Sequence, residues 1–247
     1  MIEVIEGDCE VILDKLEVEG RKYDCIVMDP PYSESDFYDK PNLKSLVPKL
    51  YRLLKDNCIL YVFGEGGELY RDFAEHYSRA FKILWDMVLV RQSGIPPMSG
   101  KHVVRKHHTL LAMYRKGDKI ANLRIRTYFG ERTDKIREGG IVTRDNKMFR
   151  DSVGYVQSVF DVGFIPQTKE YVGHPNQKPL SLMTLLIKMV KDTDNFIVLD
   201  PFAGSGTTGV ACRILGANAT LIEIKHEYVE MIRKRLEETK CTIDSFT

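Results

Sequence analysis

FIVLDPFAGSGTTG, residues 196–209, joins an apolar run to a glycine-rich turn. The apolar residues 196–199 predict a buried strand, and a helix is expected over about 206–215. Between them, GSGTTG (204–209) fits the spacing G-x-G-x-x-G, which presents backbone amides to a ligand at a helix N-terminus. Glu223 ends the next predicted strand, where a carboxylate can accept hydrogen bonds from ribose hydroxyls. This combination predicts a site for an adenosine-containing ligand rather than a plain strand-to-helix turn.

The residues between the strand and the glycines narrow the choice of ligand. In a dinucleotide site the glycines usually follow the strand, whereas here the four residues DPFA (200–203) intervene. The Asp200 carboxylate would repel a pyrophosphate and attract a ligand ammonium group. The sequence therefore favours S-adenosylmethionine, which has an amine and a sulfonium but no phosphate, over a nicotinamide dinucleotide.

The rest of the chain alternates predicted strands with predicted helices. Strands are expected at 2–6, 24–28, 58–63, 81–91, 108–115, 196–199 and 219–224, and helices at 10–19, 43–55, 67–79, 206–215, 226–238 and after Pro179. This alternation predicts βαβ units and a mostly parallel α/β sheet. Residues 116–172 break the pattern, because they are polar, basic and irregular with isolated aromatic residues. An insertion is expected there.

A second motif, DPPY at residues 29–32, follows the predicted strand 24–28. Open α/β sheets bind ligands at this edge, and two consecutive prolines stiffen the turn and remove two backbone donors. The Asp29 carboxylate and the Pro30 carbonyl could both accept hydrogen bonds from one NH2 group, while Tyr32 could stack on a planar base. Two such acceptors would favour the nucleophilic form of an exocyclic amine. Alone, DPPY could equally be a strand terminator; beside the glycine loop it indicates catalysis.

Composition and charge limit the classes of protein to which the chain can belong. The chain has 247 residues, of which 43% are hydrophobic and 29% charged, which excludes a collagen, a disordered tail or a disulfide scaffold. Its net charge is only +1, yet residues 91–150 hold fifteen Lys and Arg against five acids. This excess could attract a polyanion or form a solvated basic face.

The cysteine pattern and the N-terminus bear on the compartment. Five scattered cysteines without a CxxC pair indicate a reducing cytosol and no structural zinc. The N-terminus does not resemble a signal peptide, and no apolar run approaches membrane-spanning length. We therefore expect a cytoplasmic protein without a membrane partner.

Together the motifs resemble the DNA amino-methyltransferases, which methylate N6 of adenine or N4 of cytosine. DPPY matches their catalytic motif, DPFAGSGT (200–207) their cofactor loop and Glu223 their ribose-binding acid. GDC (7–9) resembles the element whose Asp holds the cofactor adenine, and HPNQKP (174–179) resembles an element of the methionine pocket. Because the catalytic motif precedes the cofactor motif, the chain resembles the permuted β group. One departure is His107-His108, where the family often has His-Glu.

The resemblance implies a seven-stranded, mostly parallel Rossmann-like sheet in circularly permuted order, with helices on both faces. It divides the methyltransferase domain into a catalytic half (1–115), a variable target-recognition region (116–172) and a half that binds S-adenosylmethionine (173–247). The permuted order would begin at the third strand of the fold and finish with the first two.

The resemblance also assigns site residues. The catalytic residues are Asp29, Pro30, Pro31 and Tyr32; the cofactor-binding residues are Asp8, Cys9, Lys178, Asp200, Phe202, Ala203, Gly204, Ser205, Gly206, Thr207, Thr208 and Glu223; the DNA-binding residues are Arg91, Lys101, Arg105, Lys106, Arg124 and Arg126. No metal is expected. Methyl transfer would pass directly from S-adenosylmethionine to a base flipped out of double-stranded DNA, without a covalent enzyme intermediate.

The identity of the acceptor leaves alternatives. Asp at the head of DPPY favours N6 of adenine, but some cytosine-N4 enzymes share it. Related RNA and protein-amide methyltransferases more often have Asn-Pro-Pro-Tyr and place the cofactor loop first. A non-catalytic nucleic-acid-binding subunit is the alternative from another class. Homodimers are common in the related group and a cognate restriction endonuclease is a candidate partner, but the sequence tests neither and does not reveal the recognition sequence.

Overall fold

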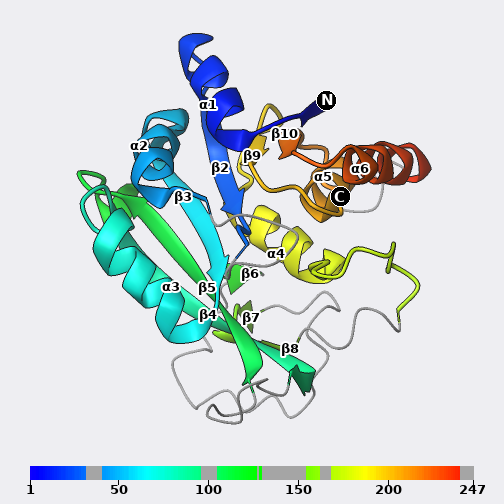
Figure 1. Ribbon diagram of the computed structural model, residues 1–247. Coiled ribbons are helices and arrows are strands. Elements are labelled where there is room, and N and C mark those ends of the chain that lie inside the picture. Colours follow the sequence, from blue (N-terminus) through cyan, green and yellow to red (C-terminus); the bar gives the residue numbers. More distant parts are fainter. Residues whose placement is uncertain (32–40, 96–104, 127, 130–153, 162–167, 240–247) are drawn as a thin grey trace.

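The computed structural model of the chain describes residues 1–31, 41–95, 105–126, 128–129, 154–161 and 168–239 (Figure 1). The strands are β1 (Ile2–Glu6), β2 (Tyr23–Met28), β3 (Leu54–Gly64), β4 (Phe81–Ile95), β5 (Arg105–Arg115), β6 (Tyr128–Phe129), β7 (Gly154–Tyr155), β8 (Val159–Asp161), β9 (Ile197–Asp200) and β10 (Asn218–Glu223). The helices are α1 (Cys9–Val18), α2 (Leu43–Leu53), α3 (Gly66–Asp72), α4 (Leu180–Val190), α5 (Thr207–Ile214) and α6 (His226–Glu238). A π-helical turn, Phe73–Tyr77, follows α3, so the single helix expected over 67–79 changes geometry midway.

Eight strands form one sheet in the order β1-β10-β9-β2-β3-β5-β4-β8. Only β5 runs against its neighbours β3 and β4, and the other pairs are parallel, so the predicted mostly parallel sheet is confirmed. The predicted count of seven strands was wrong by one. The additional strand, β8, has three residues and lies in the irregular segment 116–172, where so short a run carries no readable periodicity.

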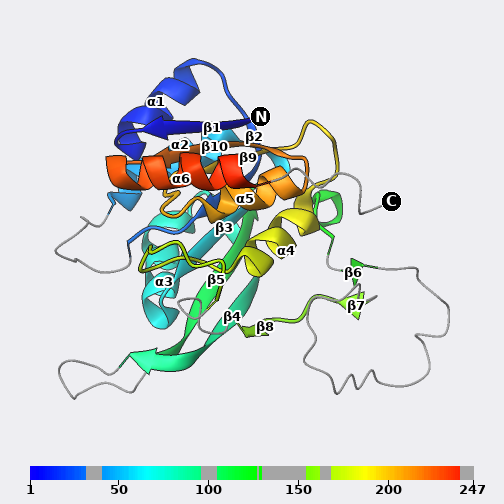
Figure 2. The ribbon, with the colours of Figure 1, turned by 90° about the vertical axis from the view of Figure 1, so that its right-hand side faces the viewer.

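Two hydrophobic cores lie on opposite faces of this sheet (Figures 1 and 2). Helices α1, α2 and α3 cover one face, and α4, α5 and α6 cover the other. The central strand β2 shows how the sequence serves both faces. Its residues Cys25 and Val27 join one core, whereas Ile26 and Met28 join the other, as the two-residue period of a strand requires. All six residues of β2 are buried, as expected of a parallel strand covered on both faces.

The strand order creates a switch point between β9 and β2. From β9 the chain passes through α5 to β10 on one side, and from β2 it passes through α2 to β3 on the other. A crevice opens at such a point beyond the carboxyl ends of the two strands, and ligands bind there. The first strand, β1, pairs with the last, β10, and the permuted order stays a prediction. No helix in the described part of the chain has the length and hydrophobicity needed to span a membrane.

Candidate active site

A cavity of about 580 Å³ opens at this switch point, a size typical of small-molecule sites. Its walls come from the carboxyl ends of β1, β2, β9 and β10 and from the turn before α4. Of the predicted site residues, the lining includes Asp8, Cys9, Asp29, Pro30, Pro31, Lys178, Asp200, Phe202, Ala203, Gly204, Ser205, Thr207, Thr208 and Glu223. Residues as far apart in the chain as Asp8 and Glu223 therefore meet in one cavity. Gly206 forms the N-cap of α5 behind the lining, and Tyr32 lies outside the described residues.

The glycine loop requires its glycines for two reasons. Gly204 and Gly206 have φ values of +50° and +75°, in the left-handed region that other L residues rarely adopt. A Cβ at Gly206 would lie 2.9 Å from Cγ1 of Ile232, and a Cβ at Gly204 would lie 3.1 Å from Nε2 of His174. Both the turn and the close approach of neighbouring side chains therefore depend on the absence of a side chain.

Glu223 holds this loop from the adjacent strand. Its buried carboxylate accepts hydrogen bonds from the backbone N–H of Gly204 at 2.8 Å and of Lys225 at 3.0 Å. Burial raises the pKa of Glu223 above its ordinary value. Each carboxylate oxygen has further acceptor capacity, so Glu223 can still accept hydrogen bonds from a ligand diol in the cavity.

Asp200 differs from the expected open counter-ion. It is buried, and it accepts hydrogen bonds from the Thr208 hydroxyl and, at 3.0 Å, from the backbone N–H of Phe202. Burial raises the pKa of Asp200 to about 7, so its carboxyl group is only partly ionised near neutral pH. The prediction that its charge attracts a ligand ammonium stays a prediction. Asp200 fixes the turn between β9 and the glycine loop.

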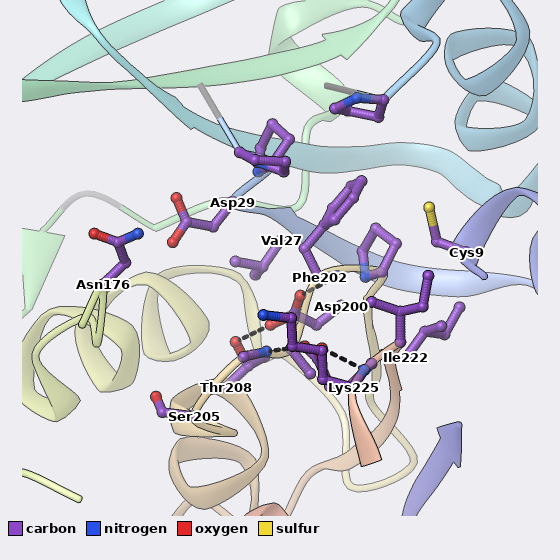
Figure 3. A pocket seen from close by; sticks show the side chains of 18 of the residues that line it. Cys9, Val27, Asp29, Asn176, Asp200, Phe202, Ser205, Thr208, Ile222 and Lys225 are labelled. Atoms are coloured by element: carbon purple, nitrogen blue, oxygen red, sulfur yellow. Dashed lines mark hydrogen bonds between the residues drawn. The ribbon is translucent and has the colours of Figure 1, made fainter. Parts of the chain in front are cut away.

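Asp29 forms an ion pair with Lys178, which the sequence did not predict. Asp29 follows β2, whereas Lys178 precedes α4, and the Lys178 ammonium also lies 5.2 Å from the centre of the Phe63 ring. Asp29 and Asn176 face one another at one end of the cavity, with Cys9 at the opposite end (Figure 3). The ion pair thus connects the expected catalytic motif with the segment expected to bind the cofactor.

Asp8 caps a helix at the other end of the cavity. Its Oδ1 accepts hydrogen bonds from the backbone N–H groups of Glu10 and Val11 and caps the first turn of α1. The neighbouring Cys9 thiol is not a reactive nucleophile, because burial and the adjacent acids raise its pKa to about 12.

Sequence analysis missed two residues of the site. Arg235, on α6, donates hydrogen bonds to the Ser205 carbonyl at 3.0 Å and to the Thr207 hydroxyl at 2.9 Å, and burial lowers its pKa. Its position was readable, since helical spacing places it on the apolar face of 226–238, where a cation needs a buried partner. His174 lies in the quoted HPNQKP motif but was not singled out, and it lines the cavity beside Gly204.

Of the six predicted DNA-binding residues, the structure describes the side chains of Arg124 and Arg126. Arg124 binds the carboxylates of Asp192 and Asp24, and Arg126 donates its backbone N–H to the Met189 carbonyl at 2.6 Å. The ion pair with Asp24, at the start of β2, places Arg124 near the amino ends of the parallel strands, and its contact with DNA stays a prediction. For Arg91, Arg105 and Lys106 only the backbone, in strands β4 and β5, is described, and Lys101 lies outside the described residues.

The family model described as DNA methylase, for N6 and N4 methyltransferases, matches residues 23–234. The chain belongs to this DNA methylase family. Among the relatives of this DNA methylase, the type II methyltransferase M2.DpnII of Streptococcus pneumoniae is 30% identical over 259 residues, covering 95% of this chain and 89% of the relative. The type II methyltransferase M.HinfI of Haemophilus influenzae is 24% identical, covering 96% and 68%.

Solved structures share the fold of this DNA methylase. M1.HpyAVI in complex with SAM aligns with a TM-score of 0.65 and 24% identity, over 96% of this chain and all of that one. The PvuII DNA methyltransferase, described as cytosine-N4-specific, aligns with a TM-score of 0.66 and 16% identity, over 95% and 86%. At these identities the alignments support the shared fold and leave the acceptor base to the site itself.

Proposed function

We propose that this DNA methylase transfers a methyl group from S-adenosylmethionine to N6 of an adenine in double-stranded DNA. The observation that carries the proposal is that Asp29 and Pro30 line the same cavity as the glycine loop and Glu223. Donor and acceptor would therefore meet at one place without movement of either half of the chain.

The residues of the cavity fit S-adenosylmethionine. Glu223 has acceptor capacity for the ribose hydroxyls, Asp8 lies where it could accept from the adenine amine, and Phe202 and Ile222 supply apolar wall. The loop around Gly204 leaves space that a Cβ would fill. When bound, the cofactor supplies a methyl group activated by its sulfonium. The protein contributes alignment of that methyl group with the acceptor amine.

Asp29 and Pro30 would act on the acceptor. Lys178 forms an ion pair with Oδ2 of Asp29, and the Asp29 carboxylate and the Pro30 carbonyl would be the acceptors for the two hydrogens of the target amine. These acceptors stabilise the positive charge that develops on the nitrogen as the methyl group is transferred. Tyr32 would stack on the flipped base, and residues 116–172 would read the target sequence.

Asp at the head of DPPY supports adenine over cytosine as the target base. A cytosine-N4 enzyme would use the same acceptors, so the base must be identified chemically. A cognate restriction endonuclease and a homodimer are further parts of this proposal and need separate binding measurements.

The test is incubation with tritiated S-adenosylmethionine and unmethylated bacterial genomic DNA, followed by hydrolysis to nucleosides and chromatography. We expect label in N6-methyl-2′-deoxyadenosine. Label in N4-methyl-2′-deoxycytidine would keep the mechanism and replace the base. Label in RNA or protein alone would reject DNA as the substrate, and cofactor binding without transfer to any acceptor would favour a non-catalytic nucleic-acid-binding subunit.

A further inference from the structure

Helices α1 and α2 lie side by side on one face of the sheet (Figure 1) and are joined by three polar contacts. The contacts join Glu10 to Ser45, Asp14 to Lys49 and Glu17 to Arg52, and the members of each pair are 35 positions apart in the chain. A constant offset means that the two helices run in the same direction. The first contact therefore lies at the N-terminal ends of both helices, where Glu10 lines the cavity.

The first contact differs chemically from the other two. Asp14 meets the Lys49 ammonium at 2.7 Å, and Glu17 meets the Arg52 guanidinium, with Nη2 at 3.0 Å from the carboxylate. Glu10 instead accepts hydrogen bonds from two uncharged donors, the Ser45 hydroxyl at 2.6 Å and the backbone N–H of Asn42 at 3.3 Å. Its carboxylate is thus placed at the first turn of α2.

Glu10 caps α2 from the neighbouring helix. Asn42 is the N-cap residue, but its own side chain makes no capping hydrogen bond within the described part of the chain, and the first turn of α2 contains no acid. In a capping box, an acid at the third helical position accepts from the N–H of the N-cap residue. Ser45 holds that position here, and Glu10 supplies the carboxylate. A negative charge is also favourable at a helix N-terminus.

The start of α2 forms part of the wall beside the catalytic turn. Pro41 and Asn42 line the cavity together with Glu10. Pro41 also lines a second, smaller pocket together with Pro30 and Pro31, so the chain that leaves the catalytic turn comes back beside it. By fixing the start of α2, Glu10 fixes the wall next to Pro30, whose carbonyl is expected to hold the acceptor amine.

The backbone of Glu10 is tied to the end of the cavity where the cofactor adenine is expected. Its N–H donates a hydrogen bond to Oδ1 of Asp8 at 2.7 Å, and its carbonyl accepts one from Lys49 Nζ at 2.9 Å. Asp8 is the acid expected to hold the adenine. One residue therefore connects this acid, through the backbone, with the start of α2, through the side chain.

We propose that Glu10 is a positioning residue for methyl transfer. Its carboxylate holds the start of α2, and with it the wall beside the catalytic turn, in a fixed place relative to the bound cofactor. This inference rests on the proposed function, because it takes the alignment of a methyl donor with an acceptor amine as the task of the cavity. Since transfer depends on that alignment, loss of the Glu10 carboxylate should slow the chemical step more than it weakens binding.

The test measures single-turnover methylation of DNA at saturating S-adenosylmethionine. Glu10→Ala should lower this rate about tenfold or more, the scale expected when reacting groups are slightly misplaced. Affinity for S-adenosylmethionine, measured by calorimetry, should stay within about threefold of the wild type, because Asp8 and Glu223 are unchanged. Glu10→Gln keeps an acceptor oxygen for the start of α2 and should recover most of the rate.

The other two contacts between the helices provide matched controls. Asp14→Ala and Glu17→Ala each break a contact between α1 and α2 at residues that are not among the described residues lining the cavity. Both should leave the rate per folded molecule unchanged, and urea denaturation reports the stability of every variant. A rate reduced as much in the controls as in Glu10→Ala would mean that the contacts only hold the helices together, which would overturn the inference.

The remaining outcomes separate this inference from the proposed function. An active wild type with an unchanged rate in Glu10→Ala would overturn the inference alone, as would parallel loss of rate and cofactor affinity. A wild type that transfers no methyl group to DNA would overturn the proposed function too. If Glu10→Ala does not fold, Ser45→Ala decides, because it removes the hydroxyl from the α2 side of the contact: a smaller loss of rate is expected, and an unchanged rate would overturn the inference.

Discussion

Acidic side chains lie at both ends of the parallel strands, but their interactions differ between the two ends. At the amino ends of the strands, Asp24 is 3% exposed and receives Lys55 at 2.9 Å, Arg124 at 3.1 Å and the Ile197 N–H at 3.0 Å. At the carboxyl ends, Glu223 and Asp29 line a large cavity. A charge network enclosed by the fold stabilises it, whereas acids that line a cavity are available to a ligand.

Asp29→Ala tests the site at the carboxyl ends of the strands and is expected to have the largest effect on activity. Methyl transfer to DNA should fall by about 10³-fold, the scale for removing a group that stabilises transition-state charge. S-adenosylmethionine affinity should stay nearly constant, because Lys178, released from its ion pair, remains available to an anionic ligand. Single-turnover methylation and calorimetry measure the two quantities, and parallel loss of both would remove the catalytic role from Asp29.

Asp24→Asn tests the opposite edge and should act on stability alone. Breaking a buried ion pair costs about 3 kcal/mol of unfolding free energy, here because Lys55 and Arg124 lose their shared carboxylate and the charge-assisted bonds weaken. Urea denaturation measures the loss. The rate of methylation per folded molecule should remain that of the wild type, and a reduced rate would mean that the amino-end network also serves catalysis.

The contrast between the edges also explains what sequence could predict. Apolar runs located β2 and β9, and α5 and α6 fall where helices were expected. The catalytic motif and the cofactor loop each follow one of these buried strands. The sequence could not show that Arg124 and the arginines of the β4–β5 hairpin lie at different places in the fold. Net charge along the chain does not indicate at which end of the strands a residue lies, and β5 runs antiparallel to β3 from one end of the sheet to the other.

The partners of the motif residues were equally hidden. The Lys178–Asp29 pair joins residues 149 positions apart, and neither residue type requires the other. The pKa of Asp200 depends on burial by both the loop and the sheet, which no local pattern encodes. Arg235 was the exception, because a cation on an apolar helix face shows in the sequence that a buried polar partner exists.

Arg235→Met tests whether the hydrogen bonds that Arg235 donates to the glycine loop serve stability, as the Asp24 network does, or ligand binding. An apolar side chain of similar length can replace a buried cation with little loss of stability, but Ser205 and Thr207 would lose their donor. We expect S-adenosylmethionine binding to weaken about tenfold, the equivalent of one hydrogen bond of the loop. Calorimetry with Lys234→Met as the control, an exposed residue beside it on α6, checks this; equal effects of both variants would contradict it.

Asp200 gives a pH dependence of stability that separates it from an ordinary surface carboxylate. Its pKa is raised to about 7 in the folded protein from 3.8, so the folded state binds the proton more tightly than the unfolded state. Stability from this group is therefore complete below pH 3.8 and is lost as pH rises toward 7, by at most about 1.4 kcal/mol per pH unit. Asp200→Asn removes this slope, so the stability of the wild type relative to the variant should decline between pH 5 and about 7 and level off above pH 8. Urea denaturation at each pH measures the difference. A difference that grows with pH would mean that the folded protein stabilises Asp200 as a carboxylate. Asp200 would then fit the counter-ion role expected from the sequence and belong to the ligand site, and not only to the support of the loop.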